Sequence, residues 1–381
     1  MSFRIGQFEL SAPVVLAPMA GVTNAPFREM CRSFAPGLVY VNEMVMATPV
    51  VHGNAKTDRM ISFAPDEHPR SLQLYGSDPE TMGRAVAKLC DAGRVDHIDI
   101  NFGCPAAKVT RRGGGAAVPA RAELLRAILR AAVSIASPYG VPVTAKFRMG
   151  LFDDWLTHLR TGEVCAEEGV ASIALHARTV QQHYSGEARW EAIAELKDAV
   201  GSIPVLGNGD IWEASDAVRM MAETGCDGVV IGRGCLGRPW LFADLVEALA
   251  GRPVPESRLL GEVCDVMVRH ARLLVNHLGE NHAMRDFRKH TGWYMSGYPV
   301  GPEVRRRFSM VKSLMELEDI VAGLDPTARI VEGGERIKRG HTNGPIKVSL
   351  PDGWLDGHRR DELLHDVSVP DDDQVMALSG G

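Results

Sequence analysis

The residue whose chemistry the sequence indicates most directly is a cysteine in the stretch 99–105, which reads DINFGCP. An ordinary thiol has a pKa of about 8.5, so Cys104 would be mostly protonated at neutral pH and able to donate a proton to a neighbouring carbon. Phe102 and Pro105 beside it favour that neutral form because they exclude water. A lone cysteine is more often a small buried apolar residue, but its place just after an apolar segment favours a reactive role.

Other polar residues share this position, because each ends or follows a short apolar segment. Lys146 and Arg148 are two residues apart, so both would point to the same side of a strand, and His176 and Arg178 have the same spacing. Strand ends tolerate polar residues in any protein, but the beginnings of these segments mostly lack matching Lys, His or Asn. We therefore expect one common rim that carries Gln73, Asn101, Cys104, Lys146, Arg148, His176, Arg178, Asn208, Asp210 and Arg233.

Two glycine turns late in this series are typical of a phosphate site. They read GNGDI at 207–211 and VVIGRG at 229–234. Glycine lets backbone N–H groups approach an anion closely, and Arg233 adds a guanidinium that can bind it in a bidentate manner. No G-x-G-x-x-G follows the first apolar segment, so the sequence argues against a dinucleotide held tightly on a Rossmann unit.

The elements that would position these residues alternate along the chain. Eight apolar runs are too short for helices and resemble buried parallel strands: 14–16, 38–41, 71–74, 98–100, 143–147, 173–175, 204–206 and 228–231. Helical patterns fill most of the gaps, at 79–90, 122–135, 157–168, 190–200 and 213–224. Such units predict a (β/α)8 barrel (a TIM barrel) within residues 1–250, with a doubly wound open sheet as the alternative. The reactive groups of such a barrel lie at the C-terminal ends of its strands, where the rim residues fall.

The loop that carries Cys104 is long and rich in glycine, reading FGCPAAKVTRRGGG over residues 102–115. Long loops in compact domains are usually functional or mobile. This one adds the cations Lys108, Arg111 and Arg112 to the thiol. It is therefore suited to close over an anionic substrate.

The pattern of the sequence changes after residues 251–255. Apolar residues then recur at helical spacing, which predicts a small C-terminal α-helical domain at 256–325. Residues 326–381 turn polar and end near an acidic run at 371–373, so we expect a weakly structured tail there. The two apolar stripes that support the helical domain are Val263, Val266, Met267, His270 and Leu274, and Phe308, Val311 and Met315.

Composition excludes several other classes of protein. The 45% hydrophobic and 24% charged fractions are ordinary for a globular chain, and the net charge of −6 leaves nucleic-acid binding to a local patch. Seven scattered cysteines without a C-x-x-C pair argue against zinc-ribbon and thioredoxin-like sites, so we expect no metal and a reducing, cytoplasmic compartment. We find no signal peptide and no apolar run long enough to cross a membrane, and we expect a monomer.

Taken together, these motifs resemble the bacterial tRNA-dihydrouridine synthases. The matching segments occur in family order: APMAGVT at 17–23, QLYG at 73–76, DINFGCP, KFRMG at 146–150, HART at 176–179, GNGDI and IGRG. The resemblance implies FMN on the barrel, NADPH as reductant and uridines of tRNA as substrate. It also implies that the cofactor-binding residues are Pro18, Met19, Ala20, Gln73, Lys146, His176, Asn208, Gly209, Asp210, Gly232 and Arg233. One departure is Ala177, where the family usually has glycine, and this puts a phosphate contact by that backbone in doubt.

The resemblance further implies that Asn101 contacts the target uracil and that the helical domain grips the tRNA. We place Arg148 with the substrate-binding residues, together with Arg285, Arg288 and Lys289, which would share one helix face. The stretch 285–312 holds seven cations and two acids, a net charge of +5. We also expect Trp293, Tyr294 and Tyr298 to offer flat surfaces for bases.

Reduction of the uracil C5=C6 bond requires a hydride at C6, which FMN N5 would supply, and a proton at C5, for which Cys104 is the candidate acid. Lys146 would stabilise the negative charge of the reduced flavin. One rival interpretation is a flavin barrel enzyme for a free small molecule, such as a dihydroorotate or dihydropyrimidine dehydrogenase. Another is an RNA-binding protein without catalysis on the same barrel.

Overall fold

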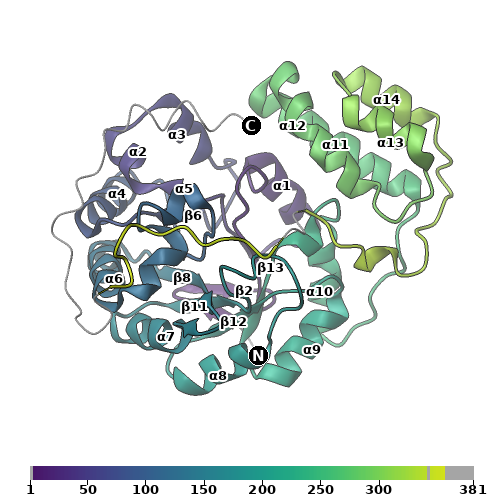
Figure 1. The fold of residues 1–381 in the computed structure, drawn as a ribbon. Coiled ribbons are helices and arrows are strands. Elements are labelled where there is room, and N and C mark those ends of the chain that lie inside the picture. Colours follow the sequence, from purple (N-terminus) through teal and green to yellow (C-terminus); the bar gives the residue numbers. More distant parts are fainter. Residues whose placement is uncertain (1–2, 341–343, 357–381) are drawn as a thin grey trace.

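The computed structural model describes residues 3–340 and 344–356, and its main feature is a barrel of parallel strands surrounded by helices (Figure 1). The sheet order is β4-β3-β13-β12-β11-β8-β7-β6-β5, with every neighbouring pair parallel. Its strands are β3 (Val14–Leu16), β4 (Val39–Tyr40), β5 (Val45–Met46), β6 (Ser71–Tyr75), β7 (His97–Phe102), β8 (Val143–Arg148), β11 (Ser172–His176), β12 (Val205–Asn208) and β13 (Gly228–Ile231).

The two edge strands, β4 and β5, are halves of one strand that residues 41–44 interrupt. Val41 donates its backbone N–H to Leu16 O at 3.4 Å, and Asn42 donates its N–H to Ser71 O at 2.9 Å. The interrupted strand therefore touches both ends of the sheet and closes it. The prediction of a (β/α)8 barrel is confirmed, and the open-sheet alternative is wrong.

A buried ion pair between Arg28 and Glu67 stabilises the segment 41–44 that interrupts this strand. Arg28, which is fully buried, donates to both carboxylate oxygens of Glu67, at 2.5 and 3.0 Å, and to Asn42 Oδ1 at 2.9 Å. A buried ion pair is tolerated when hydrogen bonds satisfy both groups, and Arg28 also donates to the carbonyls of Thr23 and Ser62. This network fixes the loop that leads from β4 to β5 at the rim.

Helices cover the outside of the barrel close to their predicted positions. In α4, for example, Asp78 accepts the Thr81 N–H at 2.7 Å and Pro79 begins the helix, while Met82, Val86 and their neighbours face the sheet. The helices are α1 (Ala25–Phe34), α2 (Ala47–His52), α3 (Ala55–Met60), α4 (Pro79–Asp91), α5 (Ala107–Thr110), α6 (Ala122–Ala136), α7 (His158–Glu167), α8 (Glu191–Ala199), α9 (Ala214–Thr224) and α10 (Leu241–Leu249).

The barrel has one open end. The hairpin of β1 (Phe3–Ile5) and β2 (Phe8–Leu10) packs its apolar side chains against the interior residues Val15, Leu206 and Val230. It thereby closes the N-terminal end of the barrel. A second hairpin, β9 (Gly150–Phe152) with β10 (Trp155–Leu156), follows β8 at the opposite rim. Short 3-10 turns complete the described part: η1 (Gly115–Ala120), η2 (Ser137–Tyr139), η3 (Arg233–Cys235) and η4 (Gly334–Arg336).

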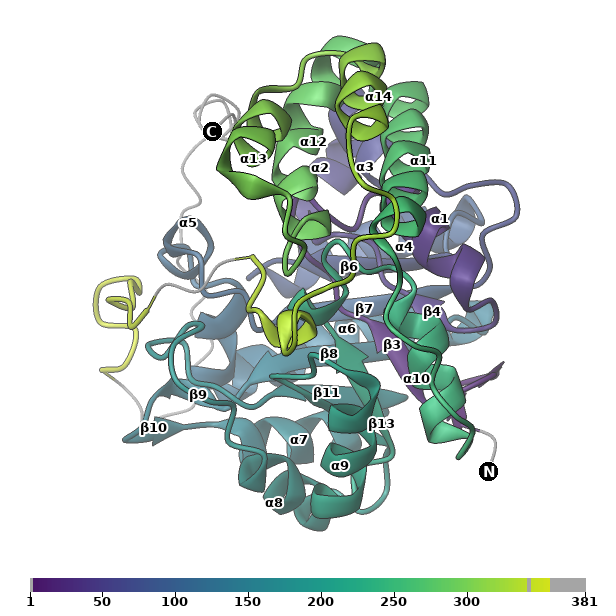
Figure 2. The same cartoon turned by 90° about the vertical axis from the view of Figure 1, so that its right-hand side faces the viewer.

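Four further helices form a separate layer beside α1 (Figures 1 and 2). They are α11 (Leu260–Leu278), α12 (Glu280–Tyr294), α13 (Gly301–Met310) and α14 (Leu314–Ala322), and their apolar faces share one core. Val263, Met267 and Leu274 of the first predicted stripe are fully buried there, and Val266 packs against the same core. The second stripe is wrong at Met315, whose side chain is 72% exposed. No helix in the described part of the chain has the length and apolar character needed to cross a membrane.

The tail beyond residue 325 has little regular structure but packs against the barrel where it is described. Arg336 bonds to the α9 residue Asp216 at 3.1 Å, and Arg339 and Trp354 are 2% and 5% exposed. Residues 357–381, which include the acidic run at 371–373, lie outside the described residues.

Buried histidines join the helical layer to the barrel and predict an acid-sensitive stability. His270 and His290 lie 4.7 Å apart between their ring centroids, both near Phe27 of α1, and neither ring nitrogen of His290 has a partner among the described residues. Burial lowers the pKa of His270 to about 3 and that of His290 well below its ordinary value. The unfolded chain would bind protons at these rings below about pH 6.5, whereas the folded chain would not.

The contribution of these two histidines to the free energy of unfolding should therefore be constant above about pH 6.5 and should fall as the pH decreases below that value. Each such ring costs about 1.4 kcal/mol per pH unit. Urea unfolding followed at pH 5, 6, 7 and 8 measures the slope. His290→Phe should reduce the slope by the share of one ring, and Phe287, which stacks on that ring, can pack on the new phenyl group. The exposed His282→Gln should leave the slope unchanged. An equal slope in His290→Phe and wild type would contradict this assignment.

Candidate active site

The Cys104 loop is tied to the end of β7 by one asparagine side chain. Asn101 Oδ1 accepts the backbone N–H groups of Gly103 at 2.9 Å and Cys104 at 2.8 Å. Asn101 Nδ2 in turn donates to Gln73 Oε1 at 2.7 Å, across from β7 to β6. The predicted rim residues Gln73, Asn101 and Cys104 are therefore brought together by direct hydrogen bonds.

A chain of buried hydrogen bonds continues from Gln73 into the barrel. Gln73 Nε2 and Thr144 Oγ1 each donate to the Asp99 carboxylate at 2.6 Å, and Thr144 Oγ1 also contacts His97 Nε2 at 2.8 Å. Burial lowers the pKa of His97 to about 4, so its ring is neutral, and Nδ1 is left to accept from the Ser71 hydroxyl at 2.7 Å. Because donors on both sides point to Asp99, the carboxylate fixes the orientation of the Gln73 and Asn101 amides.

Burial determines the proton affinity of Cys104. The thiol lies in a half-buried position, and desolvation raises its pKa, although the Ala106 backbone N–H and the cations Arg148 and Lys108 oppose that shift. Arg148 donates from Nε to Gly103 O at 3.0 Å, so the same side chain also holds the loop. The result is a protonated thiol on a fixed loop, which is the form a proton donor needs.

A half-buried lysine lies on the neighbouring strand. Lys146 is in register with Asn101 across the β7–β8 pair, and its Nζ donates to Asn208 Oδ1 at 2.9 Å. Burial and the nearby Arg148 lower the pKa of Lys146 to about 7, while the negative charge of Asp99 raises it. His176 is buried, and its pKa falls well below the ordinary value because of desolvation and the surrounding cations. A cation of such low pKa can respond to an anion placed beside it.

The two glycine turns form an anion cradle with two arginines. Arg178 is fully buried and donates from Nη2 to Asp210 at 2.7 Å, while its Nη1 is buried without a partner in the described residues. A Cβ added at Gly209 would lie 3.8 Å from that Nη1, so the unpartnered nitrogen stands over the glycine turn. Arg233 approaches Asp210 at 3.6 Å from the other turn. The pocket that Arg178, Gly209, Gly232 and Arg233 line is suited to a phosphate ester.

Of the predicted cofactor residues 18–20, the structure places two in this pocket and one outside it. Pro18 and Met19 line the same pocket as Lys146 and His176, whereas Ala20 is exposed and does not line it. The backbone N–H of Ala177 donates to Asn208 O at 3.0 Å, so it is engaged in strand pairing, in agreement with the doubt raised by the missing glycine.

Sequence reasoning missed two aromatic residues of this pocket. Tyr184 lies under the guanidinium of Arg233, 4.5 Å from its ring centroid, and Trp212 lies 5.2 Å from the same group. Both follow strand ends in the sequence, which was the available signal, but no spacing rule marked them. Together they form the aromatic wall of the anion cradle.

The predicted RNA-binding face of α12 is only partly available to a ligand. Arg285 is exposed, but Arg288 donates to Val311 O at 2.9 Å and Lys289 donates to Gly21 O at 2.7 Å, which links α12 to the barrel rim. Tyr294 and Tyr298 are 1% and 4% exposed in the helical core, so the expectation that they offer flat surfaces for bases is wrong. Their apolar rings stabilise the layer itself, and Trp293 remains half-buried.

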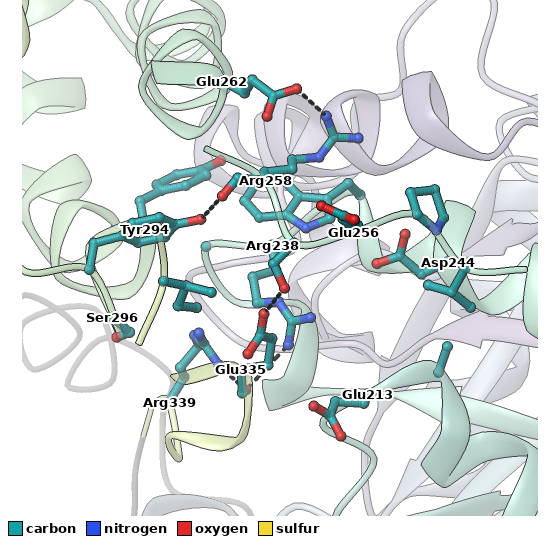
Figure 3. A pocket seen from close by; sticks show the side chains of 18 of the residues that line it. Glu213, Arg238, Asp244, Glu256, Arg258, Glu262, Tyr294, Ser296, Glu335 and Arg339 are labelled. Carbon is teal, nitrogen blue, oxygen red and sulfur yellow. Dashed lines mark hydrogen bonds and ion pairs between the residues drawn. The ribbon is translucent and has the colours of Figure 1, made fainter. Parts of the chain in front are cut away.

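A larger cavity of about 460 Å³ lies away from this rim, where α9, α10, the helical layer and the tail meet (Figure 3). Two of its arginines are held by a backbone oxygen: Arg238 and Arg339 both donate to the Glu335 carbonyl, at 3.3 and 2.7 Å. Neither Cys104 nor Lys146 lines it. We therefore assign the active site to the rim, although the cavity at the junction is larger.

The protein is a closed (β/α)8 barrel with a thiol, a half-buried lysine and an anion cradle at its C-terminal rim, where barrel enzymes carry their active sites. The chain belongs to the dihydrouridine synthase family, because the family model "Dihydrouridine synthase (Dus)" matches residues 15–326. The resemblance predicted from the motifs is thus confirmed.

Curated bacterial relatives agree with the family. "Probable tRNA-dihydrouridine synthase" of Mycobacterium tuberculosis (strain ATCC 25618 / H37Rv) is 50% identical over 385 residues, covering 100% of this chain and 97% of the relative. The protein of the same name in Mycobacterium leprae (strain TN) is 50% identical over 366 residues, covering 90% and 95%. "tRNA-dihydrouridine synthase B" of Xanthomonas axonopodis pv. citri (strain 306) is 37% identical over 302 residues, covering 79% and 89%.

Proposed function

We propose that this protein reduces uridine to 5,6-dihydrouridine in tRNA, with FMN as cofactor and NADPH as reductant, in the cytoplasm. The observation that carries the proposal is that two groups lie at the same rim: the Cys104 thiol on a loop anchored by Asn101, and the Lys146 side chain, which is in register with Asn101 on the next strand. The names of the relatives supply the substrate class.

The rim residues fit FMN. Its phosphate ester would lie in the cradle of Arg178, Arg233, Gly209 and Gly232. There it would accept a hydrogen bond from Arg178 Nη1, which has no partner among the described residues. Its ring would lie against Pro18 and Met19, beside Lys146. When bound, FMN supplies the hydride from N5 that adds to uracil C6.

The protein's own groups then have distinct tasks. Cys104 donates its Sγ proton to C5 of the uracil, and the raised pKa of the thiol keeps that proton available at neutral pH. Asn101 holds the loop through its Oδ1, and its Nδ2 donates to Gln73 Oε1 and, at 3.4 Å, to Met44 Sδ; the weaker contact to sulfur is the one that a substrate carbonyl would replace. Lys146 stabilises negative charge beside the ring.

We further propose that residues 256–325 are the tRNA-binding domain. Arg285 is its exposed cation on α12, and Arg288 and Lys289 lie on the same helix nearer the barrel. Such a surface contacts phosphates, while the target base must leave its stack to reach the rim. Because Lys289 is bonded to Gly21 at the rim, the domain would deliver the tRNA next to Cys104.

The direct test is to express the protein in a strain that lacks dihydrouridine and to map the modified nucleoside across its tRNAs by mass spectrometry. We expect a yellow protein with a flavin absorbance spectrum and dihydrouridine at defined positions. Reduction of free uracil or dihydroorotate without tRNA would support the small-molecule dehydrogenase instead. A colourless protein that cannot bind FMN would support the non-catalytic RNA-binding interpretation.

A further inference from the structure

Residues 344–356, which we call the C-terminal strap, cross the catalytic face of the barrel. Figure 1 shows the strap in yellow in front of the barrel strands, and Figure 2 shows its far end on the side that carries α5, β9 and β10. Ile346 donates its backbone N–H to Gln181 O at 2.8 Å, in the loop that follows β11. Val348 and Leu350 pack on Leu151 of β9 and on Val180, so the strap joins loops from different parts of the rim. It lies beyond residue 326, where the match to the family model ends.

The strap ends in a tryptophan that is built into the loop of Cys104. Trp354 is 5% exposed, and its indole Nε1 donates to Ala117 O at 2.9 Å. Arg121 Nε donates back to Trp354 O at 2.8 Å, and the Arg121 guanidinium lies 5.0 Å from the indole ring centroid. A Cβ added at Gly113 would lie only 2.4 Å from the ring, so the indole rests directly on the glycine backbone.

The other side of the same loop segment touches Cys104. Ala116 donates its backbone N–H to Cys104 O at 3.1 Å. A Cβ added at Gly115 would lie 2.9 Å from Cys104 O and 3.1 Å from Cys104 Cβ. Residues 113–117 are therefore held between the Trp354 indole on one side and Cys104 on the other, with no space for a side chain at either glycine.

From this arrangement we propose that the C-terminal strap positions the catalytic loop and that Trp354 is the positioning residue. The indole fills the space beneath Gly113 and fixes Ala117, and this holds Gly115 and Ala116 against Cys104. Without the indole, the loop would keep its Asn101 anchor at one end but lose its support at the other. The proposal deepens the proposed function, because it assumes that Cys104 is the proton donor.

The experiment compares Trp354→Ala, Trp354→Phe and two truncations of the full chain. One truncation stops after residue 343 and removes the strap, and the other stops after Asp356 and retains it. The alkylation rate of Cys104 by iodoacetamide, read by peptide mass spectrometry, reports the loop directly, since the other six cysteines are buried. This readout requires neither bound flavin nor activity.

In Trp354→Ala and in the shorter truncation we expect Cys104 alkylation to be about tenfold faster, because a lost contact populates open loop conformations. The kcat for dihydrouridine formation should fall by about 100-fold, as a misplaced catalytic group does, while flavin content and the KM for tRNA stay near wild type. Trp354→Phe keeps much of the packing without the Nε1 hydrogen bond and should recover most of both properties. The truncation after Asp356 should behave as wild type.

Unchanged Cys104 alkylation in Trp354→Ala would overturn the proposal, even if activity fell. A change confined to the KM for tRNA would also overturn it, because the strap would then be a substrate contact. If the wild-type protein made no dihydrouridine at all, the proposed function would fail, yet the alkylation rates would still decide whether the strap holds the loop. Thermal unfolding of each variant separates loop release from global loss of structure.

Discussion

Replacing Cys104 with alanine should remove most dihydrouridine formation while flavin content and NADPH oxidation remain near wild type. In the proposed reaction the thiol donates the proton to C5, and loss of a positioned acid typically costs about 10²–10⁴-fold in rate. Flavin binding should survive, because the anion cradle of Arg178, Arg233 and Gly209 does not include the cysteine. Mass spectrometry of tRNA nucleosides measures the first property, and absorbance of the flavin and of NADPH measures the others.

The matched control is Cys90→Ala, which alters a buried cysteine on the outer helix α4. It should leave the reaction rate unchanged. Full dihydrouridine formation in Cys104→Ala would exclude the thiol as the acid. Equal losses of flavin reduction and product formation would instead indicate that the substitution disturbed the cofactor.

The pH dependence of the wild-type enzyme follows from the same thiol. Burial raises the Cys104 pKa, and in the proposed reaction the protonated form is the one that reacts. Activity should therefore be retained below that raised pKa and be lost as the pH rises through it. A rate that increased with thiolate formation would point to a nucleophilic role for the cysteine.

The sequence predicted the barrel well because its signals are local. The apolar runs mark the strands, helical patterns fill most of the gaps between them, and one strand end after another carries a polar residue. The runs 143–147 and 228–231, for instance, correspond to β8 (Val143–Arg148) and β13 (Gly228–Ile231). The convergence of Gln73, Asn101 and Cys104 followed from that alternation, and hydrogen bonds confirm it.

Features that depend on contacts between distant segments could not be predicted in this way. Tyr294 and Tyr298 follow a run of cations, but packing among α11–α14 buries them, and local composition does not reveal that core. The break at 41–44 is stabilised by Arg28, which binds Asn42 and is itself held by Glu67 on a separate loop. Trp354 belongs to a polar tail, and its partners Gly113, Ala117 and Arg121 lie far away in the sequence.

Replacing Lys146 should have the second large effect, on the binding of the reduced flavin, because the side chain can carry a positive charge. Burial lowers its pKa to about 7, so the side chain gains or loses its proton near neutral pH. An anion bound beside it favours the ammonium form, and in the proposed function the reduced flavin is that anion. Binding of the reduced cofactor should therefore take up a proton above about pH 7 and weaken as the pH rises further.

Lys146→Met should remove both the charge and this pH dependence. We expect the affinity for the reduced flavin to fall by about tenfold or more at pH 7, since a lost charge interaction of about 1.4 kcal/mol has that effect. Flavin reduction should slow in parallel, because the charge that stabilises the product of that step is missing. Potentiometric titration of the bound flavin between pH 6 and 9 provides the measurement.

The matched control for this substitution is Lys197→Met. Lys197 lies on the outer helix α8 and pairs with Asp227 at 2.7 Å. The reduction potential and pH slope of this variant should equal those of the wild type. If Lys146→Met gave the same slope as well, the ammonium would have no part in holding the reduced ring. Lys146 would then act only through its bond to Asn208, which orders β12 at the cradle. In that case oxidised and reduced flavin would lose affinity equally, so comparing the two dissociation constants distinguishes a charge effect from a purely structural one.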